Sequence, residues 1–99
     1  MNTRYRSAFR PGLFAGQVIV VTGGGSGIGR CTAHELASLG AHVVLVGRKL
    51  EKLQTVAEEI VVDGGYASFH AADIRDEAAV QALVTAIVVT HGRIHCLVN

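Results

Sequence analysis

Long apolar runs, an excess of charge of one sign and closely spaced cysteines are all missing from this 99-residue sequence. Its uninterrupted apolar runs, such as Val18–Val21, fall far short of the roughly 20 residues that a membrane-spanning helix needs. The sequence therefore predicts no transmembrane helix. Hydrophobic residues still make up 49% of the chain and charged residues 17%, which excludes a disordered protein and indicates one small globular domain.

The charge balance also excludes classes of partner. Nine Lys and Arg nearly cancel eight Asp and Glu, whereas nucleic-acid and membrane-surface proteins carry a basic excess, so we expect neither partner. Residues 1–34 hold arginines and no acid, as a mitochondrial transit peptide does. Pro11 and Gly12 would break such a helix, which favours an irregular arm over residues 1–16, lying on the domain. Cys31 and Cys96 are too far apart for a C-x-x-C pair, and we expect two buried, reduced thiols in a cytoplasmic protein.

Short apolar segments alternate with amphipathic ones along the chain. The apolar runs predict strands at Val18–Val21, His42–Val46, Tyr66–His70 and Ile94–Val98. Apolar residues three or four apart predict helices from Gly27 to Leu39, from Leu50 to Gly64, and from Asp76 to Gly92. The predicted inward-facing positions are Ile28, Thr32, Leu36 and Leu39 in the first helix, Leu50, Leu53, Ala57 and Ile60 in the second, and Val80, Leu83, Val84, Ile87 and Val88 in the third.

This βαβαβαβ alternation requires right-handed crossovers and a parallel sheet with helices on both faces. We therefore predict an α/β, Rossmann-type doubly wound sheet with strand order 3-2-1-4, in which residues 17–99 form the domain. In that order a ligand binds at the carboxyl ends of strands one and four. The fourth strand ends at the end of the sequence, so we expect a domain truncated after strand 4, prone to aggregate when isolated.

A glycine-rich segment stands where this fold binds its ligand. Residues 22–29 read Thr-Gly-Gly-Gly-Ser-Gly-Ile-Gly between a predicted strand and a predicted helix, which is the context of a dinucleotide site. We expect Gly23 to permit the tight turn, Gly27 the close approach of a pyrophosphate to backbone N–H groups, and Gly29 the packing of helix on sheet. Ser26 could add a hydroxyl to the phosphate oxygens. The alternative is an ordinary glycine-rich turn.

The end of the second predicted strand indicates which dinucleotide binds. An NAD site places Asp or Glu there to hold the ribose 2′-hydroxyl, but this sequence has Arg48 and Lys49. A guanidinium binds a 2′-phosphate bidentately, which favours NADP(H). The alternative is a solvated helix start, where cations are unfavourable. Arg30 is either a second contact or, as we expect, a surface residue.

The T-G-x-x-x-G-x-G spacing resembles the cofactor signature of the short-chain dehydrogenase/reductase family. Two more segments match that family: Asp73-Ile74 after the third strand, and Leu97-Val98-Asn99, which is similar to the opening of its Asn-Asn-Ala-Gly segment. The resemblance implies that Asp73 and the Ile74 amide face the adenine ring. It also implies cofactor contacts from residues of the glycine segment and the chain end, namely Gly23, Gly25, Ser26, Gly27, Ile28, Gly29 and Asn99.

The family's catalytic Tyr-x-x-x-Lys pair is missing from this sequence. Tyr5 is followed four residues later by Phe9 and Tyr66 by His70, so no catalytic residue is predicted. Two functions stay open: the cofactor-binding part of an NADP(H)-dependent oxidoreductase, or a noncatalytic dinucleotide-binding or structural fragment. The segments 10–19 and 47–53 are similar to the enoyl-CoA reductase branch, including peroxisomal trans-2-enoyl-CoA reductases. This favours a small-molecule substrate with a C=C bond conjugated to a thioester, such as an acyl-CoA of the enoyl type, over a 3-oxoacyl, alcohol or ketone substrate. The resemblance further implies a homo-oligomer, commonly a tetramer.

The histidines do not form a metal motif. His34, His42, His70, His91 and His95 show no H-E-x-x-H spacing, and we expect scattered surface or hydrogen-bonded side chains. The family often has Asp at the position of His95, whose role stays open. Asp76 and Glu77 are interpreted as helix-start residues rather than as an acid/base pair.

Overall fold

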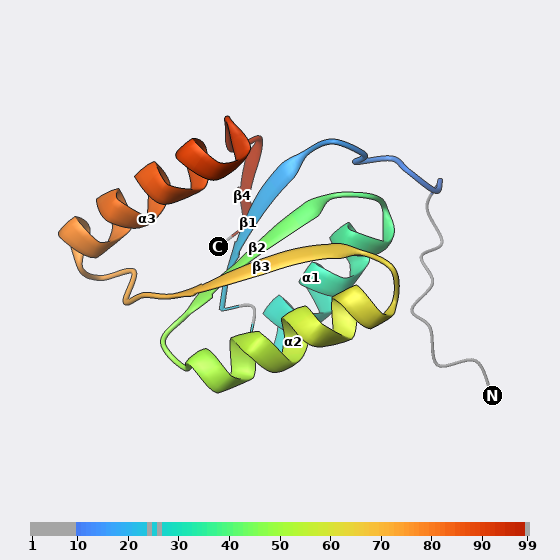
Figure 1. The fold of residues 1–99 in the computed structure, drawn as a ribbon. Coiled ribbons are helices and arrows are strands. Elements are labelled where there is room, and N and C mark those ends of the chain that lie inside the picture. The colour runs from blue at the N-terminus through green and yellow to red at the C-terminus, as the bar shows by residue number, and fades with distance from the viewer. Residues whose placement is uncertain (1–9, 24, 26, 99) are drawn as a thin grey trace.

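Strands and helices alternate strictly along the chain. A computed structural model describes residues 10–23, 25 and 27–98. Figure 1 shows its seven elements: β1 (Val18–Thr22), α1 (Gly27–Ser38), β2 (His42–Gly47), α2 (Leu50–Val62), β3 (Tyr66–Ala71), α3 (Glu77–His91) and β4 (Cys96–Val98). Each predicted strand and helix is confirmed, with ends that differ by one or two residues.

The four strands form one parallel sheet in the order β3-β2-β1-β4. Val18 pairs with His42 and Ile19 with Cys96, so β1 lies between β2 and β4. The predicted Rossmann-type topology and its strand order are therefore confirmed. The carboxyl ends of β1, β2 and β3 meet at one edge of the sheet, which is where the glycine segment begins.

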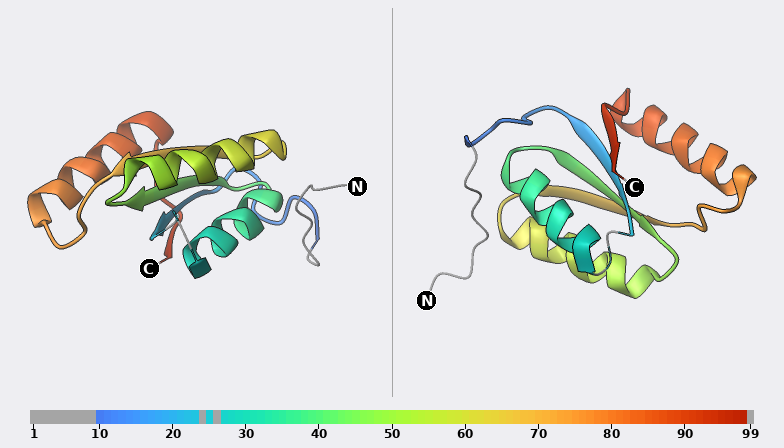
Figure 2. Two further views of the ribbon diagram at one scale, coloured as in Figure 1. Left: turned by 90° about the horizontal axis from the view of Figure 1, so that it is seen from below. Right: turned by 180° about the vertical axis from the view of Figure 1, so that it is seen from behind.

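Alternate residues of the two central strands point to opposite faces of the sheet. Ile19 and Val21 of β1 pack with buried residues of α1 and α2, whereas Val18 and Val20 pack with Ile87 of α3. Helices α1 and α2 therefore cover one face and α3 the other, as Figures 1 and 2 show. Both central strands are buried on both sides, which explains their continuous Val and Ile content.

The helix ends follow from local chemistry. Gly40 has a φ of 97° after α1, and Gly92 has a φ of 89° after α3, as expected for glycines that end helices in a left-handed conformation. The Asp76 side chain accepts hydrogen bonds from the N–H groups of Ala78 and Ala79, which confirms its role at the start of α3.

Several residues that were predicted to face the core are exposed instead. The helices extend past the sheet at their ends, or they contact the sheet through only a few of their residues. Ile28 is 87% exposed in the first turn of α1, and Leu50 is 48% exposed in the first turn of α2. Val84 and Val88 of α3 are more than 40% exposed, while Ile87 is buried. Both cysteines are also exposed: Cys31 lies in α1 beside the groove that separates it from α2, and Cys96 lies on β4 at the sheet edge. The predicted burial of the two thiols is therefore corrected.

The segment before β1 lies on the domain where the structure describes it. Phe14 packs against the core between the sheet and α1, and its N–H donates to the Leu39 carbonyl at 2.8 Å. Residues 1–9 of the predicted arm, which spans residues 1–16, lie outside the described residues. Among the helices that are described, none combines the length and the apolar character that crossing a membrane requires.

Candidate functional site

A cleft opens at the carboxyl edge of the sheet, over the ends of β1, β2 and β3. The strand order predicts a binding point between the ends of strands one and four, and the described lining of this cleft contains no residue of β4. The volume of the cleft is about 420 Å³. The ends of three strands and the segments that follow them line it: Thr22 and Gly23 after β1, Val46–Arg48 after β2, and Ala72–Arg75 after β3. The Gly23 N–H donates to the Val46 carbonyl at 2.7 Å and the Ala72 N–H to the Gly47 carbonyl at 2.8 Å, so the three strand ends are hydrogen-bonded together.

The glycine segment leaves this edge open. Gly23 and Gly27 have φ values of 69° and 61°, in the left-handed region that favours glycine. A Cβ at either position would meet no atom within 4 Å, so the space beside both glycines is empty. Gly27 begins α1, whose first N–H groups have no partner within the helix and whose first turn contains no acid. A phosphate fits this arrangement.

Gly25 and Gly29 are placed differently from the two turn glycines. A Cβ on Gly25 would lie 3.0 Å from the Lys52 Cβ and 3.5 Å from the Lys52 carbonyl carbon, so this glycine allows the turn to approach α2. Gly29 is half-buried in the first turn of α1, and Ile28 beside it is exposed. The predicted contacts of Ser26 and Asn99 lie outside the described residues.

Arg48 and Lys49 lie where the second strand ends, and both are exposed. Arg48 lines the cleft, and its charge contributes to lowering the pKa of Asp73 on the neighbouring segment. Lys49 stands at the start of α2 with no side-chain cap to the helix. Two cations thus lie at a helix start, where the dipole disfavours them. An anion bound beside them would offset that cost.

Asp73 shares the cleft with an arginine that sequence reasoning missed. The Arg75 N–H and Nε donate to Asp73 Oδ1 at 3.0 and 3.1 Å, and Arg75 Nη2 donates to Oδ2 at 3.0 Å. These bonds hold the pKa of Asp73 at about 2, so the carboxylate stays ionised at neutral pH. The signal was present as an arginine two residues after the matched aspartate. Ile74 is half-exposed beside them.

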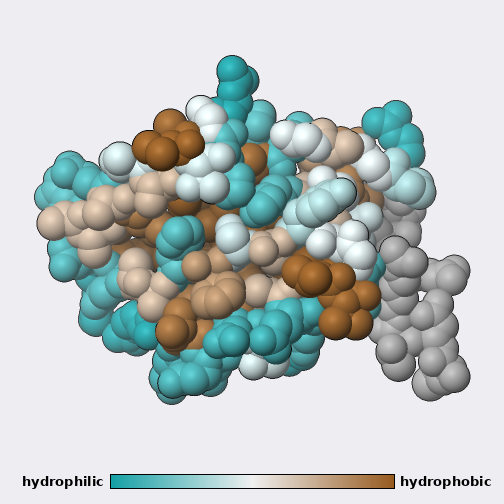
Figure 3. Space-filling model, in the orientation of Figure 1, coloured by the Kyte–Doolittle hydropathy of each residue, from teal (hydrophilic) through white to brown (hydrophobic). Residues whose placement is uncertain are grey.

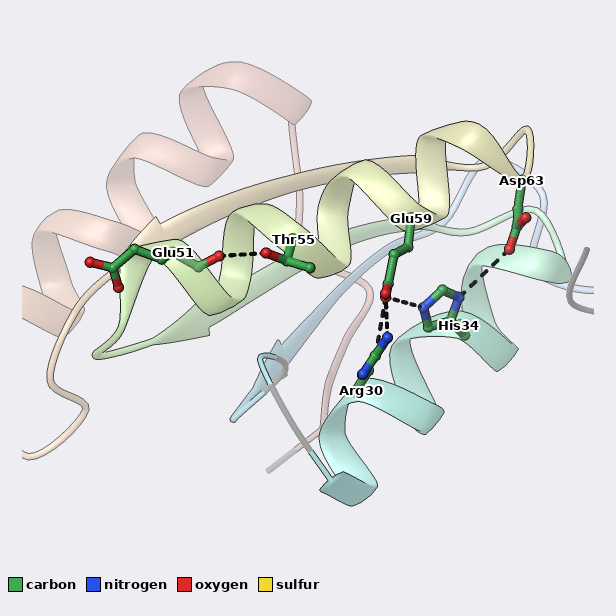
Figure 4. A network of polar contacts seen from close by, with 6 residues as sticks. All are labelled: Arg30, His34, Glu51, Thr55, Glu59 and Asp63. Carbon is green, nitrogen blue, oxygen red and sulfur yellow. Dashed lines mark hydrogen bonds and ion pairs between the residues drawn. The ribbon is translucent and has the colours of Figure 1, made fainter. Parts of the chain in front are cut away.

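Arg30 points away from this edge. Figure 4 shows it between α1 and α2, where its Nε donates to Glu59 Oε1 at 3.0 Å and its Nη2 forms an ion pair with the same carboxylate. His34 Nε2 lies 3.0 Å from Glu59 Oε1, and His34 Nδ1 lies 3.9 Å from Asp63 Oδ2. Burial alone would raise the pKa of Glu59, but the hydrogen bonds from His34 and Arg30 outweigh it and lower that pKa. Arg30 therefore joins two helices.

His42, His91 and His95 have structural partners. His95 Nδ1 accepts a hydrogen bond from the Val18 N–H at 2.9 Å, which satisfies a backbone donor at the start of β1. The rings of His42 and His91 lie 4.2 Å apart, and His42 Nε2 lies 3.3 Å from Ser68 Oγ. Over the described ranges, no three His, Cys, Asp or Glu side chains gather to hold a metal ion.

Comparison with known proteins matches this geometry to one family. The profile of short chain dehydrogenases matches residues 17–99. The chain belongs to the short chain dehydrogenase family. The cleft and the glycine segment lie at the carboxyl ends of the parallel strands, the edge at which open α/β sheets bind ligands.

Two solved structures share this fold and much of the sequence. A citronellol catabolism dehydrogenase of Pseudomonas aeruginosa PAO1 is 70% identical, with a TM-score of 0.94 over 96% of this chain and 40% of its own. A metagenomic short-chain oxidoreductase, solved in complex with NADP, is 48% identical, with a TM-score of 0.83 over 85% of this chain and 38% of its own.

A curated relative spans the whole chain. The fatty acyl-CoA reductase of Acinetobacter baylyi is 36% identical over 99 residues, which are 100% of this chain and 33% of that protein. The chain therefore spans about a third of this relative and about two fifths of the two solved structures.

Proposed function

We propose that these residues form the cofactor-binding part of an NADP(H)-dependent oxidoreductase that transfers hydride between the nicotinamide and an enoyl-thioester or carbonyl substrate. The observation that carries the proposal is the cleft at the carboxyl edge, which exposed Arg48 lines together with Asp73 and the left-handed Gly23. The NADP complex of a relative 48% identical to this chain supports the choice of cofactor. When bound, the nicotinamide supplies the hydride donor or acceptor.

In this proposal, different residues of the cleft and the glycine segment contact different parts of the cofactor. The N–H groups at the start of α1, opened by Gly23 and Gly27, hold the pyrophosphate, with Ser26 and the backbone of Ile28 and Gly29 beside it. Arg48 binds the 2′-phosphate bidentately and Lys49 adds its charge. Asp73 accepts from the adenine amine while the Ile74 N–H donates to the ring. Gly25 keeps the turn close to α2. Asn99 is assigned to the cofactor from the family resemblance alone.

The preference for NADP(H) is testable at Arg48. Arg48→Asp should reduce the ratio of NADPH to NADH affinity about tenfold or more, because a hydrogen bond between charged groups contributes about 1.5–3 kcal/mol. The matched control is Arg93→Asp, which makes the same charge change at an exposed arginine between α3 and β4. Fluorescence titration of the bound reduced nicotinamide measures both ratios. An unchanged preference in Arg48→Asp contradicts the assignment.

The substrate follows from resemblance rather than from geometry. A fatty acyl-CoA reductase among the relatives supports an acyl-thioester, and the resemblance of residues 10–19 and 47–53 narrows this to an enoyl-CoA. The citronellol catabolism dehydrogenase, at 70% identity, supports a second candidate, an alcohol or carbonyl of a branched acyclic chain. Turnover of the intact enzyme with a trans-2-enoyl-CoA and with citronellal, compared side by side, separates the two.

A noncatalytic fragment is the competing function. Because no Tyr-x-x-x-Lys stands in the sequence, we expect the 99-residue chain to bind NADPH without oxidising it when an enoyl-CoA or a carbonyl compound is added. Loss of reduced-nicotinamide absorbance with this chain alone would overturn the assignment to a cofactor-binding part. We further propose a cytoplasmic enzyme that assembles as a tetramer.

A further inference from the structure

The carboxylate of Asp73 accepts three hydrogen bonds from Arg75, which contact with adenine alone does not require. It lies in the segment between β3 and α3, and its side chain is 39% exposed. The Asp76 N–H donates to the Asp73 carbonyl at 3.0 Å, which closes a turn over residues 73–76. The side chain of Arg75 folds back across this turn onto the carboxylate, although Arg75 itself is 75% exposed.

The hydrogen bonds leave a defined acceptor on Asp73. An ionised carboxylate offers about four lone-pair sites, two on each oxygen. Asp73 Oδ1 accepts from both the N–H and the Nε of Arg75, while Oδ2 accepts, among the residues that the structure describes, from Nη2 alone. One site on Oδ2 therefore stays available to a donor in the cleft. The fork of the guanidinium also fixes the plane of the carboxylate, and hence the direction of that site.

Stability does not explain this pair. Ion pairs between exposed side chains contribute little to folding, and both members of this one face solvent. Arg75 also lines the cleft with Arg48, so it lies beside the ligand rather than behind the core. A contact of this kind acts on the direction and charge of the carboxylate, which matter only when something binds there.

We propose that Arg75 is a positioning residue that directs the free acceptor site of Asp73 Oδ2 at the exocyclic amine of adenine, and so selects a 6-aminopurine dinucleotide over a 6-oxopurine one. This inference rests on the proposed cofactor function. The amine of adenine donates to Oδ2, whereas the 6-oxo group of hypoxanthine is an acceptor and meets a negative charge. Arg75 holds the Asp73 carboxylate in one orientation through three hydrogen bonds, so that the discrimination does not depend on a mobile side chain.

The test compares NADPH with its hypoxanthine analogue, nicotinamide hypoxanthine dinucleotide phosphate in the reduced form. Fluorescence titration gives the ratio of the two affinities for the wild type, Arg75→Gln, Arg75→Lys and the control Arg93→Gln. Arg75→Gln should lower the preference for adenine about threefold to tenfold, part of what a lost charged hydrogen bond costs. Arg75→Lys, which keeps the charge but not the fork, should recover only part of it.

The outcomes separate this inference from the proposed function. A wild-type protein that binds neither dinucleotide overturns both. A wild type that binds both equally, or an Arg75→Gln variant that keeps the wild-type preference, overturns the role of Arg75 and leaves NADP(H) binding standing. The thermal midpoint of Arg75→Gln should match that of the wild type, because the pair is exposed. A changed preference with an unchanged midpoint supports positioning rather than a folding defect.

Discussion

The two faces of the sheet carry hydrophobic cores of different size. Under α1 and α2, eleven buried residues form one core with four from α2, including Leu53 and Ile60. Under α3, five buried residues form a smaller core to which the helix contributes Ile87 alone. Figure 3 shows hydrophobic surface over α3, and the exposed residues there include Val84, Val88 and Val89. The first face holds the domain together, whereas the second leaves apolar surface uncovered.

A second cleft lies on the face of the sheet that α3 covers. It measures about 310 Å³ and lies between the sheet and α3, lined by Val20, Leu83, Ile94 and other apolar residues. The cleft at the carboxyl edge of the sheet is lined by segments that follow β1, β2 and β3. Of these segments, Ala72 packs against the core under α3.

The largest expected effect is a cavity in the α1/α2 core. Leu53→Ala should lower the free energy of unfolding by about 2–5 kcal/mol, because Leu53 is fully buried and its neighbours cannot close the gap. Val88→Ala on the exposed side of α3 should change it by less than about 0.5 kcal/mol. Urea unfolding measures both, and equal losses at the two positions would contradict the distinction between the faces.

The next effect concerns how α3 begins. Asp76→Ala removes the acceptor for two backbone N–H groups and should cost about 0.5–2 kcal/mol of stability. Asp76→Asn keeps a capping oxygen and should recover most of the loss. Thermal unfolding measures the series. If Asp76→Ala unfolds like the wild type, the attachment of α3 does not depend on its cap.

A smaller effect is expected where α1 meets α2. Glu59→Gln should cost about 0.2–1 kcal/mol at neutral pH, because Arg30 loses its charged partner. The lowered pKa of Glu59 means that its contribution is present above the ordinary pKa and disappears as pH falls through the folded value. The difference between variant and wild type should therefore vanish in acid. Glu58→Gln, on the neighbouring exposed position, is the control and should show no such pH dependence.

The smallest effect is a mild acid sensitivity where α3 ends. Burial, and then the nearby His91, lower the pKa of His42. The unfolded chain therefore binds a proton near the ordinary pKa of about 6.5 before the folded protein does, and stability should fall as pH drops below that value. His42→Gln should flatten this part of the profile, and His91→Gln should weaken it only in part. An unaltered profile in His42→Gln would show that the sensitivity arises elsewhere.

Periodicity and glycine chemistry predicted what depends on local sequence. The glycine segment between β1 and α1 and the capping role of Asp76 depend on neighbouring residues, and both are observed. The strand order depends on contacts between distant segments, and it was predicted from the usual order of the fold that the βαβαβαβ alternation indicates. The exposure of Val84 and Cys31 depends on how far a helix lies from the sheet, which no local pattern records. Arg75 was missed because its role arises from a turn that brings it back onto Asp73.

The cofactor claim is tested most directly by hydrogen–deuterium exchange of the protein with and without NADPH. We expect slower exchange in peptides that cover residues 22–29, 47–49 and 72–75, with no change along the outer side of α3 or around Arg30 and Glu59. Protection should require the 2′-phosphate, so NADH at the same concentration should protect less. Protection confined to the α1/α2 groove, or none at the carboxyl edge of the sheet, would show that NADPH does not bind at this edge.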